Sequence, residues 1–300
     1  MSSGWDNIKI GLKLLRPFTL FLPLVSAIFF SIIALRYYHE MDNIWSFAPT
    51  IIAGAIALSL SNGVSNCINQ VSDRTEDSVH PEKSKRPVAS GQITETQALS
   101  LAIAGLIISF FFAGQVNKRF VTFLSLIYLG TFIYSMPPIR LKKRLFWNNL
   151  IIAVVRGFIG PLATFAIVGN AFEPPFLIIA LVMFTFTLGL NPLKDVPDVD
   201  SDKSAGVRNF CTEYGVRTAM LISIPFVFLP YLYILFFTWT GFLVSNAIYL
   251  LLLIPIGVLI VYSILRIPQK KVVTENTVLW LLFYANSMLY VVGFACIYFL

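Results

Sequence analysis

The chain has 300 residues, of which 57% are hydrophobic and only 12% are charged, and its formal net charge is +7. A water-soluble domain carries about 25% charged residues, so this composition excludes an ordinary soluble globular protein. The apolar residues form long blocks that continue to Leu300. A removable signal peptide would account for only one such block, so we expect an integral membrane protein.

Nine segments are apolar enough to cross a membrane, because a spanning helix needs about 20 mostly apolar residues. In chain order they are residues 17–36, 47–70, 97–116, 120–137, 148–169, 174–193, 217–238, 241–265 and 277–300. The sequence therefore predicts an all-α membrane protein, a bundle of about nine transmembrane helices that forms a single domain over residues 1–300.

Lysine and arginine residues are distributed unequally between the two sides of the predicted bundle. Of the 22 basic residues, 18 lie in the N-terminal arm and the even-numbered loops, the last pair being Lys270 and Lys271. Because such residues favour the cytoplasmic side, we expect a cytoplasmic N-terminus and an external C-terminus, which requires an odd number of spans. The positive charge thus reflects membrane orientation, and no basic face on a soluble module indicates a nucleic-acid partner.

The first acidic segment continues the second predicted span into its loop. It contains Asn66, Asn69, Asp73 and Asp77. At about 100° per residue, these four side chains fall on one face of a helix. We therefore expect them to act together.

The second acidic segment follows the sixth predicted span and repeats the arrangement. Asn191, Asp195, Asp198 and Asp202 share one helical face, whereas Asp200 lies on the far side, about 140° away from Asp195. Both segments face the predicted cytoplasmic side.

Carboxylates crowded at a membrane boundary repel each other unless a cation lies between them. Ligand sets made only of oxygen favour Mg²⁺ over zinc or copper, and protein-bound Mg²⁺ often keeps coordination positions for substrate phosphates. One acidic run at a helix end is more often a solvated surface, but two matched runs on one side are not explained that way. They predict a pair of Mg²⁺ ions that binds one diphosphate.

These segments resemble the motifs of UbiA-type membrane prenyltransferases. The first motif is Asn69-x-x-x-Asp73-x-x-x-Asp77 followed by Lys85-Arg86-Pro87 and Ser90-Gly91, and the second is Lys194-Asp195-x-Pro197-Asp198-x-x-x-Asp202 followed by Gly206 and Arg208-Asn209-Phe210. Tyr134-Ser135-x-Pro137-Pro138-x-Arg140-x-Lys142 is similar to the motif of the fourth loop, and Arg16-Pro17 to the opening of the family. His80-Pro81 stands where the family often has Asn-x-Pro, and Asp200-Ser201-Asp202 where many members have Glu-Gly-Asp.

The resemblance implies Mg²⁺-dependent transfer of an isoprenyl group from a prenyl diphosphate to a lipophilic or aromatic acceptor, through an allylic carbocation inside the membrane. The metal ligands would be Asn69, Asp73, Asp77, Asp195, Asp198 and Asp202. The catalytic residues would be Asp73, Asp198, Lys142 and Tyr134. Substrate would contact Arg16, Arg86, Lys142, Asn66, Asn191 and Arg156. We expect the polar cytoplasmic loops near 73–96 and 194–216 to form a cap over this site.

Two questions stay open in the sequence. Arg156 lies inside a predicted span, where an ionisable residue indicates function or pairing; a structural ion pair and a contact with an acidic acceptor are both compatible with it. The acceptor is predicted to be an aromatic quinone precursor, because Arg156-Gly157 resembles members that act on such rings. Synthesis of a glycerol-phosphate ether lipid is the alternative.

Two other classes of membrane protein fit less well. An ion or phosphate transporter would carry its acidic residues near the bilayer midplane and show inverted repeats, but here the acids lie at span ends. A CDP-alcohol phosphotransferase would carry one contiguous Asp-rich motif, which the sequence lacks.

Overall fold

The computed structural model describes residues 4–266 and 278–299. Within these ranges the chain consists of helices and connecting turns, with no strand. Lys270, Lys271 and Leu300, which entered the sequence argument, lie outside the described residues.

The helices follow one another along the whole described chain. The longer ones are α1 Gly4–Leu15, α2 Pro17–Tyr37, α3 Ile44–Ser72, α5 Glu95–Gly114, α6 Lys118–Ser135, α7 Leu145–Ile152, α9 Pro174–Lys194, α12 Val216–Trp239, α13 Ile254–Arg266 and α14 Val278–Phe299. The shorter ones are α4 Arg74–Ser78, α8 Gly160–Phe165, α10 Val199–Ser204 and α11 Phe210–Tyr214. The 3₁₀ segments are η1 Met41–Asn43, η2 Lys83–Lys85, η3 Leu141–Lys143 and η5 Ser245–Leu253, and Ala153–Ile159 is a π-helix, η4.

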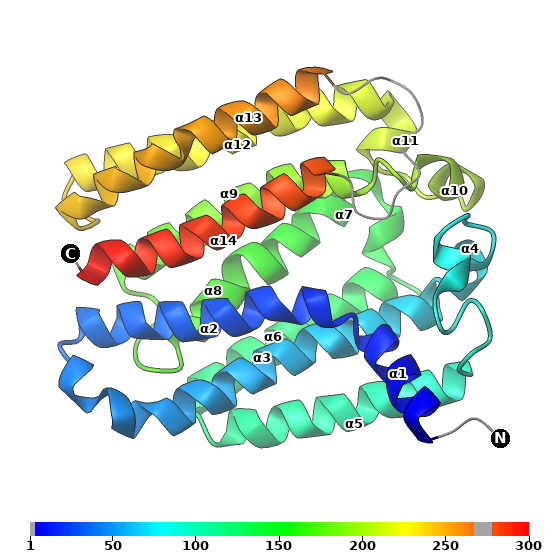
Figure 1. Cartoon of the computed structure of the whole chain (residues 1–300), viewed down its shortest axis with the longest axis horizontal. Helices are drawn as coiled ribbons and strands as arrows, with labels where there is room; N and C mark the ends of the chain where they lie inside the picture. The colour runs from blue at the N-terminus through cyan, green and yellow to red at the C-terminus, as the bar shows by residue number, and fades with distance from the viewer. Residues whose placement is uncertain (1–3, 267–277, 300) are drawn as a thin grey trace.

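The long helices run roughly side by side, and the short polar helices gather at one end (Figure 1). Helices α4, α10 and α11 lie at the end where α3, α6 and α9 finish, and α1 begins at this same end. Helix α14 finishes at the opposite end, as an odd number of crossings requires. One end of the bundle therefore collects the residues that the motifs singled out.

Eight of the nine predicted spans coincide with helices that are long and apolar enough to cross a membrane. The ninth is α6, which forms beside them but has 18 residues and begins with Lys118 and Arg119, so its hydropathy is lower. The all-α membrane class is confirmed. The orientation of the bundle in the membrane stays a prediction.

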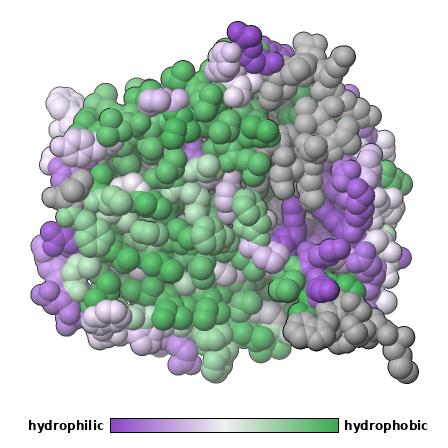
Figure 2. Space-filling model, in the orientation of Figure 1, coloured by the Kyte–Doolittle hydropathy of each residue, from purple (hydrophilic) through white to green (hydrophobic). Residues whose placement is uncertain are grey.

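The outer surface of the bundle matches a lipid environment. Apolar side chains cover most of the face seen in Figure 2, and polar ones concentrate toward the end that carries the short helices. Large apolar residues are strongly exposed, including Trp45 at 85% and Leu252 at 78%. Water-soluble monomers rarely expose apolar patches of this extent, so this band is the surface that a bilayer covers.

The predicted span 148–169 is not a regular α-helix. Its middle is the π-helix η4, in which the wider turn alters the direction of the side chains. Gly157 lies here against α9: a Cβ atom at this position would come within 2.7 Å of the Phe184 Cα and 2.9 Å of the Met183 carbonyl oxygen. The π-helix thus packs directly on the backbone of α9.

Candidate active site

A polar cavity of about 250 Å³ lies at the end of the bundle that carries the short helices. Four parts of the chain line it: the start of α2 with Arg16, the end of α3 with α4 and the following loop, the segment from the end of α6 to the start of α7, and the segment from the end of α9 through α10 and the residues after it. Both acidic segments predicted from the sequence therefore face one cavity.

The first acidic segment keeps its helical spacing although it extends from α3 into α4. Asp73 ends α3 and precedes α4. The Asp73 amide nitrogen nevertheless lies 2.9 Å from the Asn69 carbonyl oxygen, and that of Asp77 lies 2.7 Å from the Asp73 carbonyl oxygen. These bonds continue the repeat of an α-helix, so Asn69, Asp73 and Asp77 share a face as predicted.

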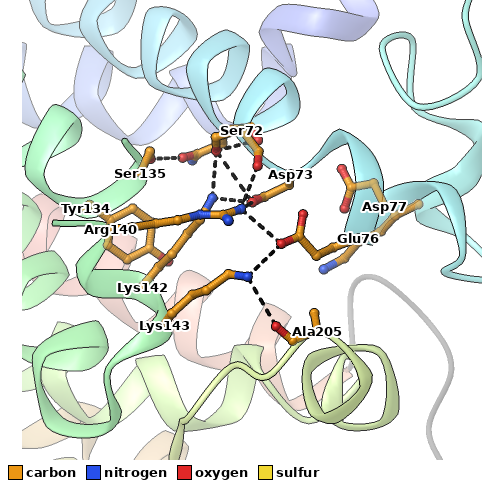
Figure 3. Close-up of polar contacts among 12 residues, drawn as sticks. Ser72, Asp73, Glu76, Asp77, Tyr134, Ser135, Arg140, Lys142, Lys143 and Ala205 are labelled. Carbon is orange, nitrogen blue, oxygen red and sulfur yellow. Dashed lines mark hydrogen bonds and ion pairs between the residues drawn. The ribbon is translucent and has the colours of Figure 1, made fainter. Parts of the chain in front are cut away.

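Cations from the loop between α6 and α7 point at this face (Figure 3). Asp73 accepts hydrogen bonds from Lys142 and from Arg140, the latter at 3.1 Å. Glu76 pairs with Arg140 at 3.1 Å and with Lys143 at 2.9 Å. The negative charge of the first segment is thus matched by basic residues of the fourth-loop motif.

The predicted ligands Asn69 and Asp77 have other partners. Ser135 donates a hydrogen bond to Asn69 Oδ1. Asp77 is buried and lies 2.9 Å from Arg86. Burial raises the pKa of the Asp77 carboxyl, and the negative charge of Asp73 adds to this effect while Arg86 opposes it.

The second acidic segment is not one continuous helix, so the helical angles calculated across it do not hold. Helix α9 ends at Lys194 and α10 begins at Val199. The turns between them include Pro197, which has no amide proton to continue the helical bonds. Asp200 is exposed and does not line the polar cavity, in agreement with the far side predicted for it.

The three predicted ligands of this segment nevertheless line the same cavity. Asp195 is buried and accepts a hydrogen bond of 3.0 Å from Asn148. The Asp198 carboxylate lies 2.5 Å from Lys83 Nζ and 3.3 Å from His80 Nε2. Since Lys83 and His80 belong to the loop after α4, these contacts join the two polar loops that were expected to form a cap.

The pKa values of Asp198 and Asp202 are shifted in opposite directions. Although burial acts to raise it, hydrogen bonds from His80 and the charge of Lys83 hold the pKa of Asp198 at about 2. Burial raises the pKa of Asp202 to about 7, and the negative charges of Asp195 and Asp198 contribute to this shift. The second segment thus places the three carboxylates Asp195, Asp198 and Asp202 near two lysines, Lys83 and Lys194.

The donor chemistry of the polar cavity fits a hard cation such as Mg²⁺. In residues 4–266 and 278–299, no three His, Cys, Asp or Glu side chains come close enough together to hold a metal ion. Asn148 Oδ1, however, is buried without a hydrogen-bond partner beside Asp195, and the repulsion among the acids of the second segment favours an added positive charge. The individual ligands stay a prediction.

A second cavity, of about 400 Å³ and lined mainly by apolar and small polar residues, extends from the polar cavity into the bundle. We call it the apolar cavity. Both cavities are lined by Arg16, Thr19, Asn69, Tyr134 and Lys194. The two cavities therefore adjoin, and the shared residues mark their boundary.

Tyr134 lies at this boundary together with Lys194. The Lys194 ammonium donates a hydrogen bond of 3.3 Å to the Tyr134 hydroxyl and lies 5.8 Å from the centre of its ring. The same ammonium lies 3.3 Å from Asp195. Tyr134, predicted to be catalytic, thus connects the second acidic segment with the apolar cavity.

The residues predicted to bind substrate occupy both cavities. Arg86 and Lys142 line the polar cavity, whereas Asn66, Asn191 and Arg156 line the apolar one. Asn66 donates hydrogen bonds of 2.8 Å to the Leu15 carbonyl and the Thr19 hydroxyl. Asn191 donates one of 2.9 Å to the Asn149 carbonyl oxygen. These two asparagines thus also fix how neighbouring helices pack.

Several residues at the site had no role in the sequence argument. Glu76 is not one of the four residues of the predicted face, yet it lies three residues after Asp73 and so on nearly the same helical face. Lys83 and Arg140 lie in or beside the motifs but had been counted as basic residues of cytoplasmic loops. Asn148 lies at the start of a predicted span, and nothing in its spacing indicates a partner.

The sequence model described as the UbiA prenyltransferase family matches residues 24–287. Among curated proteins, a probable homogentisate phytyltransferase 2 of Oryza sativa subsp. japonica is 29% identical over 296 residues, covering 93% of this chain and 76% of that protein. A homogentisate solanesyltransferase of Arabidopsis thaliana is 33% identical over 190 residues, covering 60% of this chain and 48% of that protein. A digeranylgeranylglyceryl phosphate synthase of Methanosphaera stadtmanae is 24% identical, covering 84% and 85%.

Solved structures share the fold of this chain. A UbiA homolog from Archaeoglobus fulgidus bound to GPP and Mg²⁺ has a TM-score of 0.70 and 20% sequence identity, covering 97% of this chain and 100% of that one. At this identity the likeness concerns the fold. The chain spans about half the length of several plant relatives that it matches, 47% for one from Humulus lupulus and 48% for the Arabidopsis protein.

Proposed function

The chain belongs to the UbiA prenyltransferase family, and from this premise we propose that it transfers a prenyl group from a prenyl diphosphate to an acceptor within the membrane. The observation that supports this most is the junction of the two cavities at Tyr134. A prenyl diphosphate has a highly charged head and an apolar tail, and each cavity suits one of these parts.

The head of the donor fits the polar cavity. Mg²⁺, as two ions held by Asn69, Asp73 and Asp77 and by Asp195, Asp198 and Asp202, would neutralise the diphosphate and make it a better leaving group. Arg86 and Lys142 point into this cavity from separate loops. Their N–H groups can donate to phosphate oxygens as the charge on the leaving group grows.

The tail of the donor and the reacting carbon fit the apolar cavity. Bond formation requires that the allylic carbon meet the acceptor before it meets water, and apolar walls exclude water. The face of the Tyr134 ring would stabilise positive charge on that carbon. The bond between this carbon and the diphosphate oxygen breaks, a bond to the acceptor forms, and the acceptor loses a proton.

For the acceptor we propose an aromatic ring of the quinone-precursor type, because the relatives named for homogentisate include one that covers 93% of the chain. The alternative is a glycerol-phosphate ether lipid. It is supported by digeranylgeranylglyceryl phosphate synthases that cover 84% to 89% of the chain. The two acceptors differ in chemistry, since a ring is alkylated on carbon whereas a glycerol reacts through a hydroxyl oxygen.

The test is a transfer assay on the purified chain in lipid vesicles. Radiolabelled prenyl diphosphates are offered with a panel of aromatic and prenylglyceryl phosphate acceptors, with Mg²⁺ or with EDTA. We expect a labelled lipophilic product that requires Mg²⁺ and returns when Mg²⁺ is added after EDTA. Failure to bind or consume any prenyl diphosphate would contradict the proposal.

We further propose that the polar cavity opens to the cytoplasm and that the loops joined by Lys83 and Asp198 cap it. Single cysteines in place of Ser204 and Asp42, which are both exposed at opposite ends of the bundle, test this orientation once Cys296 is replaced by serine. An impermeant maleimide added to intact cells should label position 42 alone. Labelling of position 204 alone would reverse the orientation.

A further inference from the structure

Arg156 occupies an unusual position for a charged residue. It projects from the π-helix η4 and lines the apolar cavity. Its Nη2 donates a hydrogen bond of 2.6 Å to the Ser65 hydroxyl of α3. Ser65 in turn lies 2.9 Å from the Thr131 hydroxyl of α6. Among the described residues, the hydrogen-bond partner of this guanidinium is thus a neutral hydroxyl that is itself bonded to another hydroxyl.

Arg156 has no acidic partner in the part of the chain that the structure describes. Its guanidinium forms no ion pair there and makes a single hydrogen bond, although it carries five N–H groups. This settles the question left open by the sequence against a structural ion pair within the described residues. A charge inside a membrane without a counter-ion is costly, so its presence indicates a ligand that supplies the missing negative charge.

The charges around the apolar cavity have one sign. Among its described lining residues the charged ones are Arg16, Lys194 and Arg156, and no carboxylate lines it. Arg16 and Lys194 also line the polar cavity, whereas Arg156 does not. Among the described charged residues, Arg156 is therefore the one that lines the apolar cavity without also lining the polar cavity.

Arg156 is also set apart from the residues expected to hold the diphosphate. Its partner Ser65 precedes Asp73 by eight residues on α3, which corresponds to about 12 Å along the helix axis. The cations that face Asp73 come from the loop between α6 and α7 instead. The donor's diphosphate thus has its own cations, and Arg156 remains for the second substrate.

The backbone holds Arg156 in this direction. The contact between Gly157 and α9 leaves no room for a Cβ atom, so the π-helix is fixed against its neighbour at the adjacent residue. The hydrogen bond that Arg156 donates to the Ser65 hydroxyl fixes the other end of the side chain. A guanidinium held at both ends loses less freedom when it binds a ligand.

We propose that Arg156 binds the carboxylate of an aromatic acceptor and holds the acceptor ring in the apolar cavity, so that the enzyme selects acids over their neutral analogues. The proposal rests on the proposed function and names the substrate class of its second site. A carboxylate carries one charge and matches the planar fork of one arginine. A phosphate monoester carries a greater charge, and the apolar cavity offers no second cation of its own to balance it.

The test compares two probes, homogentisate and its methyl ester, which lacks the negative charge and carries one additional methyl group, with the full chain in lipid nanodiscs. We expect the wild type to show a KM about 10- to 100-fold lower for the acid, as a hydrogen-bonded charge pair predicts. Arg156→Gln should remove this preference by raising the KM for the acid. Its Kd for a prenyl diphosphate should stay within about twofold of the wild type.

Binding gives a readout that does not depend on turnover. Homogentisate should raise the melting temperature of the wild type, and the ester should not. Arg156→Lys keeps the charge and should retain part of the preference. Arg36→Gln is the matched control, because Arg36 is bonded to the Tyr298 carbonyl oxygen and lies away from both cavities.

Three outcomes would overturn the inference: equal use of the acid and the ester by the wild type, an acid preference that survives in Arg156→Gln, or use of a prenylglyceryl phosphate with rejection of aromatic acids. Each of these leaves prenyl transfer itself intact. If instead the wild type binds no prenyl diphosphate at all, the proposed function fails, and the melting experiment still decides whether Arg156 binds a carboxylate.

Discussion

The polar and apolar cavities adjoin but differ in how the charged side chains that line them are paired. In the polar cavity, Lys142 faces Asp73, Arg86 faces Asp77 and Lys83 faces Asp198. In the apolar cavity, Arg156 faces the hydroxyl of Ser65, and no acid lines the described walls. A substrate that enters the polar cavity must replace existing ion pairs. A substrate that enters the apolar cavity meets the Arg156 guanidinium, which has no acidic partner among the described residues.

This difference separates the energetic costs of binding the two substrates. In the polar cavity each new contact with phosphate replaces an existing ion pair, so binding depends on an added cation that takes over the carboxylates. In the apolar cavity the unfavourable free energy of burying the Arg156 guanidinium arises when the protein folds, and not when the substrate binds. The following variants test this contrast, beginning with the largest expected effect.

Asp198→Ala should reduce turnover by about 100-fold or more, because Asp198 joins the two polar loops and is a predicted metal ligand. Asp200→Ala is the matched control, since Asp200 is exposed and lies outside the polar cavity. Turnover at saturating Mg²⁺ and substrate is the measurement. Equal losses in the two variants would show that the polar cavity is not where the diphosphate reacts.

Arg86→Gln should lower kcat/KM for the prenyl diphosphate about 10- to 100-fold and also lower the melting temperature. The variant leaves the buried Asp77 carboxylate without its guanidinium. The neighbour Lys85 pairs with Glu82 at the surface, so Lys85→Gln should have little effect on either quantity. A similar loss in both variants would mean that loop charge in general, rather than this pair, matters.

Gly157→Ala should destabilise the protein by about 1 to 3 kcal/mol, because the added Cβ atom overlaps the backbone of α9. The displaced π-helix should also raise the KM for the acceptor while the Kd for the prenyl diphosphate stays unchanged. Gly114→Ala is the control, since its added Cβ would have no atom within 4 Å and Gly114 lines neither cavity. Equal changes for both substrates would remove the distinction between the cavities.

Ser65→Ala should raise the KM for an acidic acceptor by about three- to tenfold, since one neutral hydrogen bond positions the guanidinium. The preference for the acid over its ester should weaken without disappearing. Ser125→Ala, which removes an exposed hydroxyl of α6 bonded to the Val121 carbonyl oxygen, serves as the comparison. An unchanged KM in Ser65→Ala would mean that Arg156 is held by packing alone.

The sequence predicted the membrane helices well because long apolar blocks have few alternatives to spanning a bilayer. It also identified the acidic segments, whose composition at a membrane boundary is conspicuous. The angles calculated for the first segment hold because backbone hydrogen bonds continue through Asp73. Those for the second fail at the turn before α10, since the calculation treated Pro197 as part of a regular helix.

The sequence does not predict which charged residues form ion pairs with one another. Nothing in the spacing of Lys83 indicates that it contacts Asp198, more than 100 residues later in the chain. The contacts of Asn148 with Asp195 and of Arg140 with Asp73 likewise depend on how segments far apart in the sequence meet. Arg156 could be recognised as exceptional from its position in a span. The absence of an acid near it among the described residues, however, depends on how several helices pack together and not on any one segment.

The π-helix that carries Arg156 makes the length of this segment as important as its composition. A π-turn contains one residue more than the hydrogen-bonded turn of an α-helix, and in a regular helix each residue rotates the following side chains by about 100°. Deletion of one residue within Ala153–Ile159 would convert the π-turn into an α-turn, so that later side chains keep their directions while those inside the segment, Arg156 among them, are redirected. The extra residue of this turn, as much as the identity of Arg156, therefore sets where the guanidinium points.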